Sequence, residues 1–125
     1  MMNLRSRDNV VDNAALAARL CLDSTELAGA HARHVALNGN FIPHAFMGEV
    51  LARAGVCALA AGADARKGRA ELEAILATLE AAMAGGDQET CSVVGISFIA
   101  DGRREPFFVV LEPMLGPRMA ALIRD

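Results

Sequence analysis

Apolar residues recur every three to four positions through the first two thirds of the chain, which is the spacing of amphipathic helices. Twenty-two of the 25 alanines lie in the first 84 residues, and alanine has the highest helix propensity. A second helix is predicted from an Asp23 N-cap, with Glu26 three residues later, to the Asn-Gly-Asn at 38–40. Before it, a first helix is predicted over residues 8–22, with an apolar face made of Val11, Ala14, Ala18 and Leu22.

Two more helices are predicted in the next 45 residues. Pro43 begins the third helix, because its missing N–H costs nothing in a first turn, and this helix is predicted to end near Gly62. A loop over 62–68 separates it from the fourth helix, which is predicted to end at Gly85. The fourth helix has the clearest apolar stripe, formed by Leu72, Ile75, Leu76, Leu79 and Met83.

The segment after this helix permits two interpretations. Two runs of β-branched and aromatic residues flank an Asp-Gly pair, which is typical of a β-hairpin over residues 91–112. A helix over 87–100 instead places Cys91, Val94 and Phe98 on one face. The helix is the favoured interpretation, because two isolated strands make only a marginal sheet.

A last helix is predicted over 117–124, and the whole pattern indicates an all-α fold. We expect a compact bundle of five to six helices in one domain spanning residues 1–125, a length that can bury its own core. The alternative is an α+β fold in which residues 91–112 form the hairpin.

Composition narrows the classes of function. A net charge of -3 and the lack of Trp and Tyr disfavour nucleic-acid binding, and no apolar run reaches the length of about 18 residues that a membrane span needs. The three cysteines, which form no CxxC pair, are read as buried small hydrophobes in a reducing compartment: Cys21, Cys57 and Cys91. We therefore expect a cytoplasmic protein.

Three segments resemble one family as a set: "PHAFMGE" at 43–49, "GISFIAD" at 95–101 and "PMLGPRM" at 113–119. They are similar to a family of small bacterial all-helical domains of unknown function with a Pro-His-x-Phe-Met-Gly-acid segment, a V-S-F-[LI] helix and an L-G-P-[RK] tail. The resemblance implies an all-helical fold with a helix at "SVVGISFIA". It also implies a binding role, because some members look like immunity partners of polymorphic toxins.

The "PHAFMGE" segment holds the first candidate site. His44 falls in the first turn of the predicted third helix, and Glu49 and Arg53 form an outward i,i+4 pair in the favourable order. In a purely structural interpretation, Phe46 and Met47 are buried core residues. Functionally, His44 and Glu49 could belong to a partner-facing or ligand-facing mouth. Close packing of another helix is predicted on a face of small residues, namely Gly48, Ala52 and Gly55.

The remaining chemistry is sparse. His31 and His34 share a helix face and, with His44 or Glu26, could hold a metal, but no second strong ligand pair supports this. Neither Ser92 nor Ser97 has a His or Asp nearby in the sequence that could activate it as a nucleophile. The alternative function is therefore a small metal- or ligand-binding domain or enzyme that uses His31, His34, His44 and Glu49.

The favoured prediction is a non-enzymatic immunity protein that binds a protein toxin and uses no cofactor. After residue 62 the chain has ten acids and seven bases, a net charge of 7 - 10 = -3, so an electrostatic partner would meet this half. The predicted partner-binding residues are Glu71, Glu73, Glu80, Asp87 and Glu89, together with His44, Glu49 and Arg53.

Overall fold

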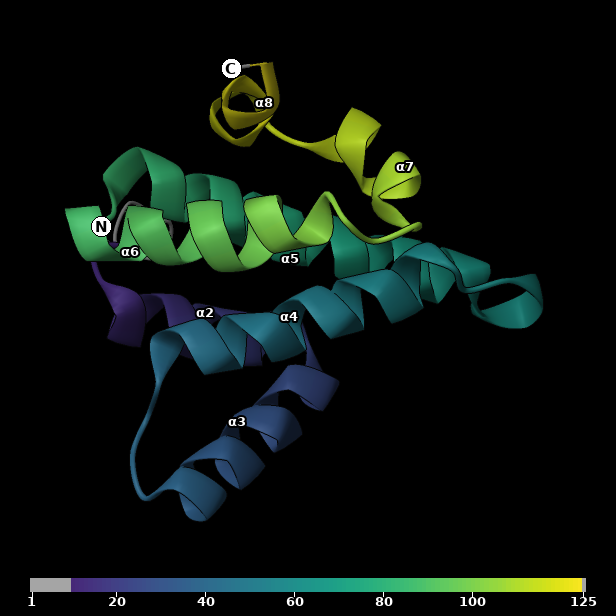
Figure 1. Ribbon diagram of the computed structural model, residues 1–125. Coiled ribbons are helices and arrows are strands. Elements are labelled where there is room, and N and C mark those ends of the chain that lie inside the picture. The colour runs from purple at the N-terminus through teal and green to yellow at the C-terminus, as the bar shows by residue number, and fades with distance from the viewer. Residues whose placement is uncertain (1–9, 125) are drawn as a thin grey trace, which may run out of the picture.

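Helices make up nearly all of the computed structural model, which describes residues 10–124 (Figure 1). Within this range no strand occurs, so the all-α prediction is confirmed and the hairpin alternative is wrong. The helix count is slightly above the predicted five to six: α2 (Asn13–Asp23), α3 (Thr25–Asn38), α4 (Pro43–Ala58), α5 (Ala65–Gly85), α6 (Gln88–Val93), α7 (Phe108–Leu111) and α8 (Pro117–Arg124). Three further helical segments are η1 (Gly62–Asp64), the π-helix η2 (Val94–Ala100) and η3 (Glu112–Met114).

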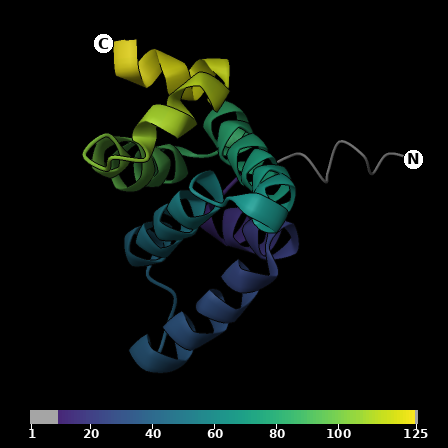
Figure 2. The same ribbon diagram turned by 90° about the vertical axis from the view of Figure 1, so that its right-hand side faces the viewer.

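The helices are stacked in layers, with α3 at one end and α8 at the other (Figures 1 and 2). α3 packs on α2 and α4, these pack on α5, and α8 rests on α5 and η2. α4 is central to this arrangement, because it contacts α3, α5 and η2. The last helix occupies the predicted residues, Pro117–Arg124.

The helix predicted over 87–100 is confirmed as α6 running directly into η2. Asp87 is its N-cap and accepts a hydrogen bond of 2.8 Å from the amide of Thr90. Val94 and Phe98 are fully buried, as their spacing predicted. Burial of this apolar face against α4 and α5 outweighs the β propensity of the individual residues.

Two predicted boundaries are wrong. α3 is capped by Ser24, whose extended backbone breaks the chain and whose hydroxyl accepts from the Leu27 amide at 3.1 Å. Asp23 instead ends α2, where it accepts a hydrogen bond from Thr78. The predicted loop over 62–68 is only η1, because the helix-forming residues from Ala65 onward already belong to α5.

The apolar face predicted for the first helix is also wrong, and residues 8 and 9 of that prediction lie outside the described range. Val11, Ala14, Ala18 and Leu22 are exposed. A second stripe is buried instead, formed by Leu16, Ala17 and Leu20. It carries more apolar surface, since it contains two leucines, and burying that surface stabilises the fold more.

The core is built on α4 and α5. Phe46 and Met47 are buried as predicted, and they lie among the largest fully buried side chains, with Phe98, Ile75 and Leu79. Burying each such side chain contributes about 1.5–3 kcal/mol. Of the three cysteines only Cys57 is fully buried, whereas Cys21 and Cys91 are partly exposed.

The helices in the described part of the chain differ in length and apolarity, the two properties that a membrane span requires. No single helix there is long and apolar enough to cross a bilayer. Pro43–Ala58 and Gly62–Gly85 reach the required length and apolarity only as a pair bent by 119°.

Candidate functional site

The outer face of α4 exposes small and apolar residues at one-turn intervals. We call this face the α4 surface, and it consists of Gly48, Ala52, Val56 and Leu59. Val56 is 58 % exposed and Leu59 is 65 % exposed. Gly48 was predicted to lie at a close helix contact, and this is wrong, because a Cβ placed on it would meet no atom within 4 Å.

Two hollows flank the Val56 side chain. The first, of 370 Å³, is mainly apolar and lies between α4 and the residues before α7, with Gly55 and Phe107 in its wall and Glu105 at its rim. Gly55 does sit at a close contact, because a Cβ there would overlap the Phe107 ring. The second hollow, of 350 Å³, lies between α4 and α5 and has both polar and apolar walls. Its polar lining comes from Arg53, Asp64, Lys67 and Glu71.

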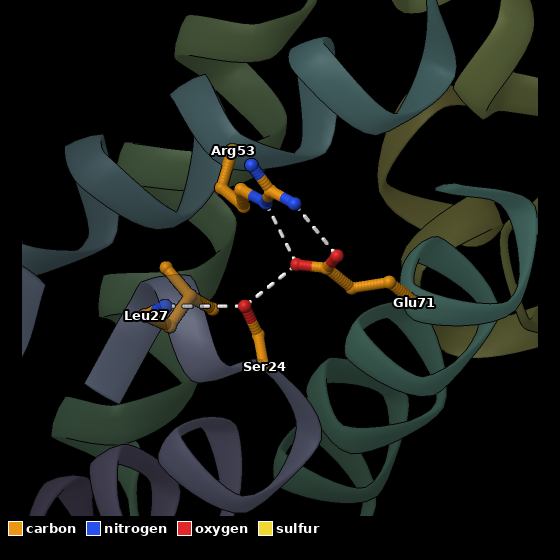
Figure 3. A network of polar contacts seen from close by, with 4 residues as sticks. All are labelled: Ser24, Leu27, Arg53 and Glu71. Atoms are coloured by element: carbon orange, nitrogen blue, oxygen red, sulfur yellow. Dashed lines mark hydrogen bonds and ion pairs between the residues drawn. The ribbon is translucent and has the colours of Figure 1, made fainter. Parts of the chain in front are cut away.

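A closed polar network forms one wall of the second hollow (Figure 3). Arg53 donates from Nε and Nη2 to the two oxygens of Glu71, at 2.7 and 2.8 Å. The Ser24 hydroxyl donates to Glu71 Oε2 at 2.6 Å and accepts from the Leu27 amide. One carboxylate thus ties α5 to α4 and to the N-cap of α3, as the three converging side chains in Figure 3 show.

The network also sets the ionisation of its members. The guanidinium of Arg53 lowers the pKa of Glu71, and the carboxylate of Glu71 raises the pKa of Arg53. Burial, assisted by the nearby charge of Glu71, raises the pKa of Cys57 to about 11. The Cys57 thiol therefore stays protonated at neutral pH and is a poor nucleophile.

The predicted Glu49–Arg53 pair is wrong. Arg53 turns toward α5 and binds Glu71, since that carboxylate offers two parallel hydrogen bonds. Glu49 instead lies with its Oε2 3.9 Å from Nδ1 of His34. Glu71 was predicted to face solvent, but its side chain is mostly buried in the network.

Two other predicted contact acids act as helix caps. Glu80 is half-buried and accepts hydrogen bonds from the amides of Arg118 and Met119, at 2.8 and 3.1 Å, so it binds the first turn of α8. Asp87 is exposed, and hydrogen bonds from the hydroxyl and amide of Thr90 lower its pKa. Glu80 therefore belongs to the scaffold, which corrects its predicted solvent-facing position.

Glu73 and Glu89 are exposed, as expected for contact residues. Glu73 accepts from Arg69 at 3.2 Å in a pair that is open to solvent. Such pairs contribute little to stability, so Glu73 is not needed to hold the fold together.

The helical histidines have structural partners. His34 is 4 % exposed, and its Nε2 accepts a hydrogen bond of 2.9 Å from the amide of Ile42, the N-cap of α4. His31 packs its ring against Phe41 and Phe46, with centroid distances of 5.4 and 5.2 Å. Among residues 10–124 no group of three His, Cys, Asp or Glu is placed to hold a metal ion. The structure thus brings His34 and Glu49 together, but it directs His44 to another partner.

That partner is Ser97, which the sequence did not connect to any histidine. His44 Nδ1 and Ser97 Oγ are 2.6 Å apart, although the two residues are separated by 53 positions in the chain. Ser97 is 6 % exposed and lies in η2, whereas His44 is exposed in the first turn of α4. Only the packing of η2 on α4 creates this pair.

Comparisons of the chain with protein-family models, with curated proteins and with solved structures returned no match.

Proposed function

We propose that this chain is a binding protein that neutralises a protein toxin by direct contact, as an immunity protein does. The α4 surface carries the proposal. It combines an exposed apolar ridge at Val56 and Leu59 with a hollow on each side of Val56. Contiguous apolar surface next to concave walls is typical of protein interfaces, where aromatic and aliphatic anchors fill such hollows.

Charge defines the partner further. Glu105 lies at the rim of the first hollow, and Asp64 lies with Lys67 in the second. The exposed acids Glu73 and Glu89 add to the negative field of this half of the chain. A toxin with a basic surface and an apolar anchor fits these features, and the field would speed its encounter.

Neutralisation by this route requires no turnover and no cofactor. An inhibitor blocks its target by burying about 1,200–2,000 Å² of total surface. The "PHAFMGE", "GISFIAD" and "PMLGPRM" segments support the proposal through their resemblance to small bacterial domains, some of them similar to immunity proteins. The proposal places the chain in the bacterial cytoplasm, where a toxin-producing cell needs protection.

Co-expression with the product of the adjacent gene tests the proposal. We expect that product alone to stop growth and this chain to restore it. Val56→Asp combined with Leu59→Asp should abolish the rescue without unfolding the chain, because both side chains are exposed. If the neighbouring product is harmless, or if it kills the cells despite this chain, the proposed function is wrong.

A matched control is Leu37→Asp. Leu37 is 85 % exposed near the C-terminal end of α3, on a different helix from the α4 surface. It introduces one of the two aspartates at an exposed leucine outside the α4 surface, so rescue should persist. Loss of rescue with Leu37→Asp as well would show that the α4 surface is not the specific contact.

A further inference from the structure

The N-terminal end of α4 carries a second feature, which does not depend on the proposed function. We propose that Ser97, with His44 as its base, is a nucleophile toward short-chain acyl esters. The pair is 2.6 Å apart between His44 Nδ1 and Ser97 Oγ, which is the distance at which an imidazole can take a hydroxyl proton.

Two helical elements hold the pair. Ser97 is in the middle of η2, a seven-residue π-helix that is flanked by helix on both sides. π-Helical segments are rare and occur often at functional sites, because they widen a helix and redirect its side chains. His44 is in the first turn of α4 behind Pro43, whose ring fixes the backbone at the helix start.

The same turn of α4 offers stabilisation for negative charge. Ile42 gives the helix no side-chain cap, and the amides of His44 and Ala45 donate no hydrogen bond to any group in residues 10–124. Free amides at a helix N-terminus carry partial positive charge, so they suit the oxyanion that forms when a hydroxyl attacks an ester.

The surface of α4 is open one turn further along the helix. Gly48 follows His44 by four residues, so both lie on one face of α4. A Cβ on Gly48 would meet no atom within 4 Å. The apolar hollow beside Val56 begins at Gly48, which favours an ester with a short apolar chain.

The proposed hydrolysis needs only the ester and water. Ser97 Oγ attacks the carbonyl carbon of the ester while its proton passes to His44 Nδ1. The bond to the alcohol breaks, and the departing alkoxide takes that proton from His44. Water then attacks the carbonyl of the acyl-Ser97 ester while His44 Nδ1 takes its proton. The bond to Ser97 Oγ breaks, His44 returns the proton to Oγ, and the acyl group leaves as the carboxylic acid.

The test is hydrolysis of p-nitrophenyl acetate, with mass spectrometry of the acylated chain. We expect acetyl on Ser97 and no hydrolysis above background with Ser97→Ala. His44→Gln should slow the reaction about 100-fold, since general-base assistance is lost. Ser92→Ala, at an exposed serine on α6, is the control and should keep the parent rate.

Two further variants sharpen the result. Gly48→Leu fills the space beside His44 and should slow p-nitrophenyl butyrate more than the acetate. Leu37→Asp, at an exposed leucine on α3, should keep the parent rate with p-nitrophenyl acetate, because it lies outside both the pair and the hollow. If Ser97→Ala retains the parent rate, His44 alone reacts with the ester and the proposal is overturned. It is equally overturned if the folded parent chain shows neither hydrolysis nor acetylation.

Discussion

The two ends of α4 satisfy their polar groups in opposite ways. Toward the C-terminus, Arg53 uses two nitrogens on Glu71, and both oxygens of that carboxylate are bonded. Toward the N-terminus, the imidazole of His44 has one hydrogen bond, to Ser97, and the adjacent amides have none within the described chain. Two glycines of α4 differ in the same way, because Gly55 is covered by Phe107 and Gly48 is open.

This difference separates the end of α4 that stabilises the fold from the end whose polar groups are free to bind or react. A carboxylate that already accepts hydrogen bonds on both oxygens has little left to offer a ligand, and its removal costs stability. A helix end with spare donors and open space can still bind or react. We therefore expect substitutions near Arg53 to change stability, and substitutions near His44 to change reactivity with little effect on folding.

The largest expected effect is that of Glu71→Ala. Removing the carboxylate leaves Arg53 and the Ser24 hydroxyl without their partner in a partly buried site, so the free energy of unfolding should fall by about 2 kcal/mol. Urea unfolding measures the change. The control is Glu73→Ala on the same helix, where the pair with Arg69 is exposed and the loss should stay below about 0.5 kcal/mol. Equal losses of unfolding free energy in Glu71→Ala and Glu73→Ala would show that the Glu71 network does not stabilise the fold more than an exposed ion pair does.

Gly55→Ala should have the next largest effect. Its Cβ overlaps the Phe107 ring, so the ring must move, at a cost of about 1–2 kcal/mol. Thermal unfolding of the single variant and of Gly55→Ala combined with Phe107→Ala measures the coupling. The double variant should lose less than the sum of the two single losses, because the clash is gone. Additive losses would show that Phe107 does not press on Gly55.

Acid should weaken the Arg53–Glu71 contribution. The pKa of Glu71 is lowered in the folded chain, so the unfolded chain binds the proton first as the pH falls. The contribution is complete above the unfolded pKa of about 4.3 and is lost as the pH falls through the lower folded pKa. Urea unfolding from pH 7 to pH 3 should show the parent losing its advantage over Glu71→Gln. A constant advantage would mean that the carboxylate is not stabilised by Arg53.

The smallest expected effect has the opposite sign. Gly48→Ala should stabilise the chain by up to about 1 kcal/mol, because the added Cβ meets nothing and alanine is the better helix former. The melting temperature should therefore rise, whereas with Gly55→Ala it should fall. A lower melting temperature for Gly48→Ala would mean that another group packs against Gly48.

Local sequence signals determined the helices themselves. Alanine content, Pro43 and the apolar spacing at Val94 and Phe98 predicted α4, α6 and η2, because helix formation depends on residues three to four positions apart. The same local reasoning could not choose between two apolar stripes on α2. That choice depends on which stripe faces a neighbouring helix, and Leu16 and Leu20 bury more surface than the stripe of Ala14 and Ala18.

The partners of Arg53 and Ser97 were decided by the tertiary structure. An i,i+4 spacing suggested that Arg53 pairs with Glu49, but α5 brings Glu71 into a two-bond geometry that a neighbour on the same helix does not match. Ser97 has no histidine near it in the sequence, and only the packing of η2 on α4 brings His44 within 2.6 Å. Hydrogen bonds act over about 3 Å in space and do not depend on how far apart two residues are in the sequence. Residues 53 positions apart can therefore form a pair that no local sequence pattern predicts.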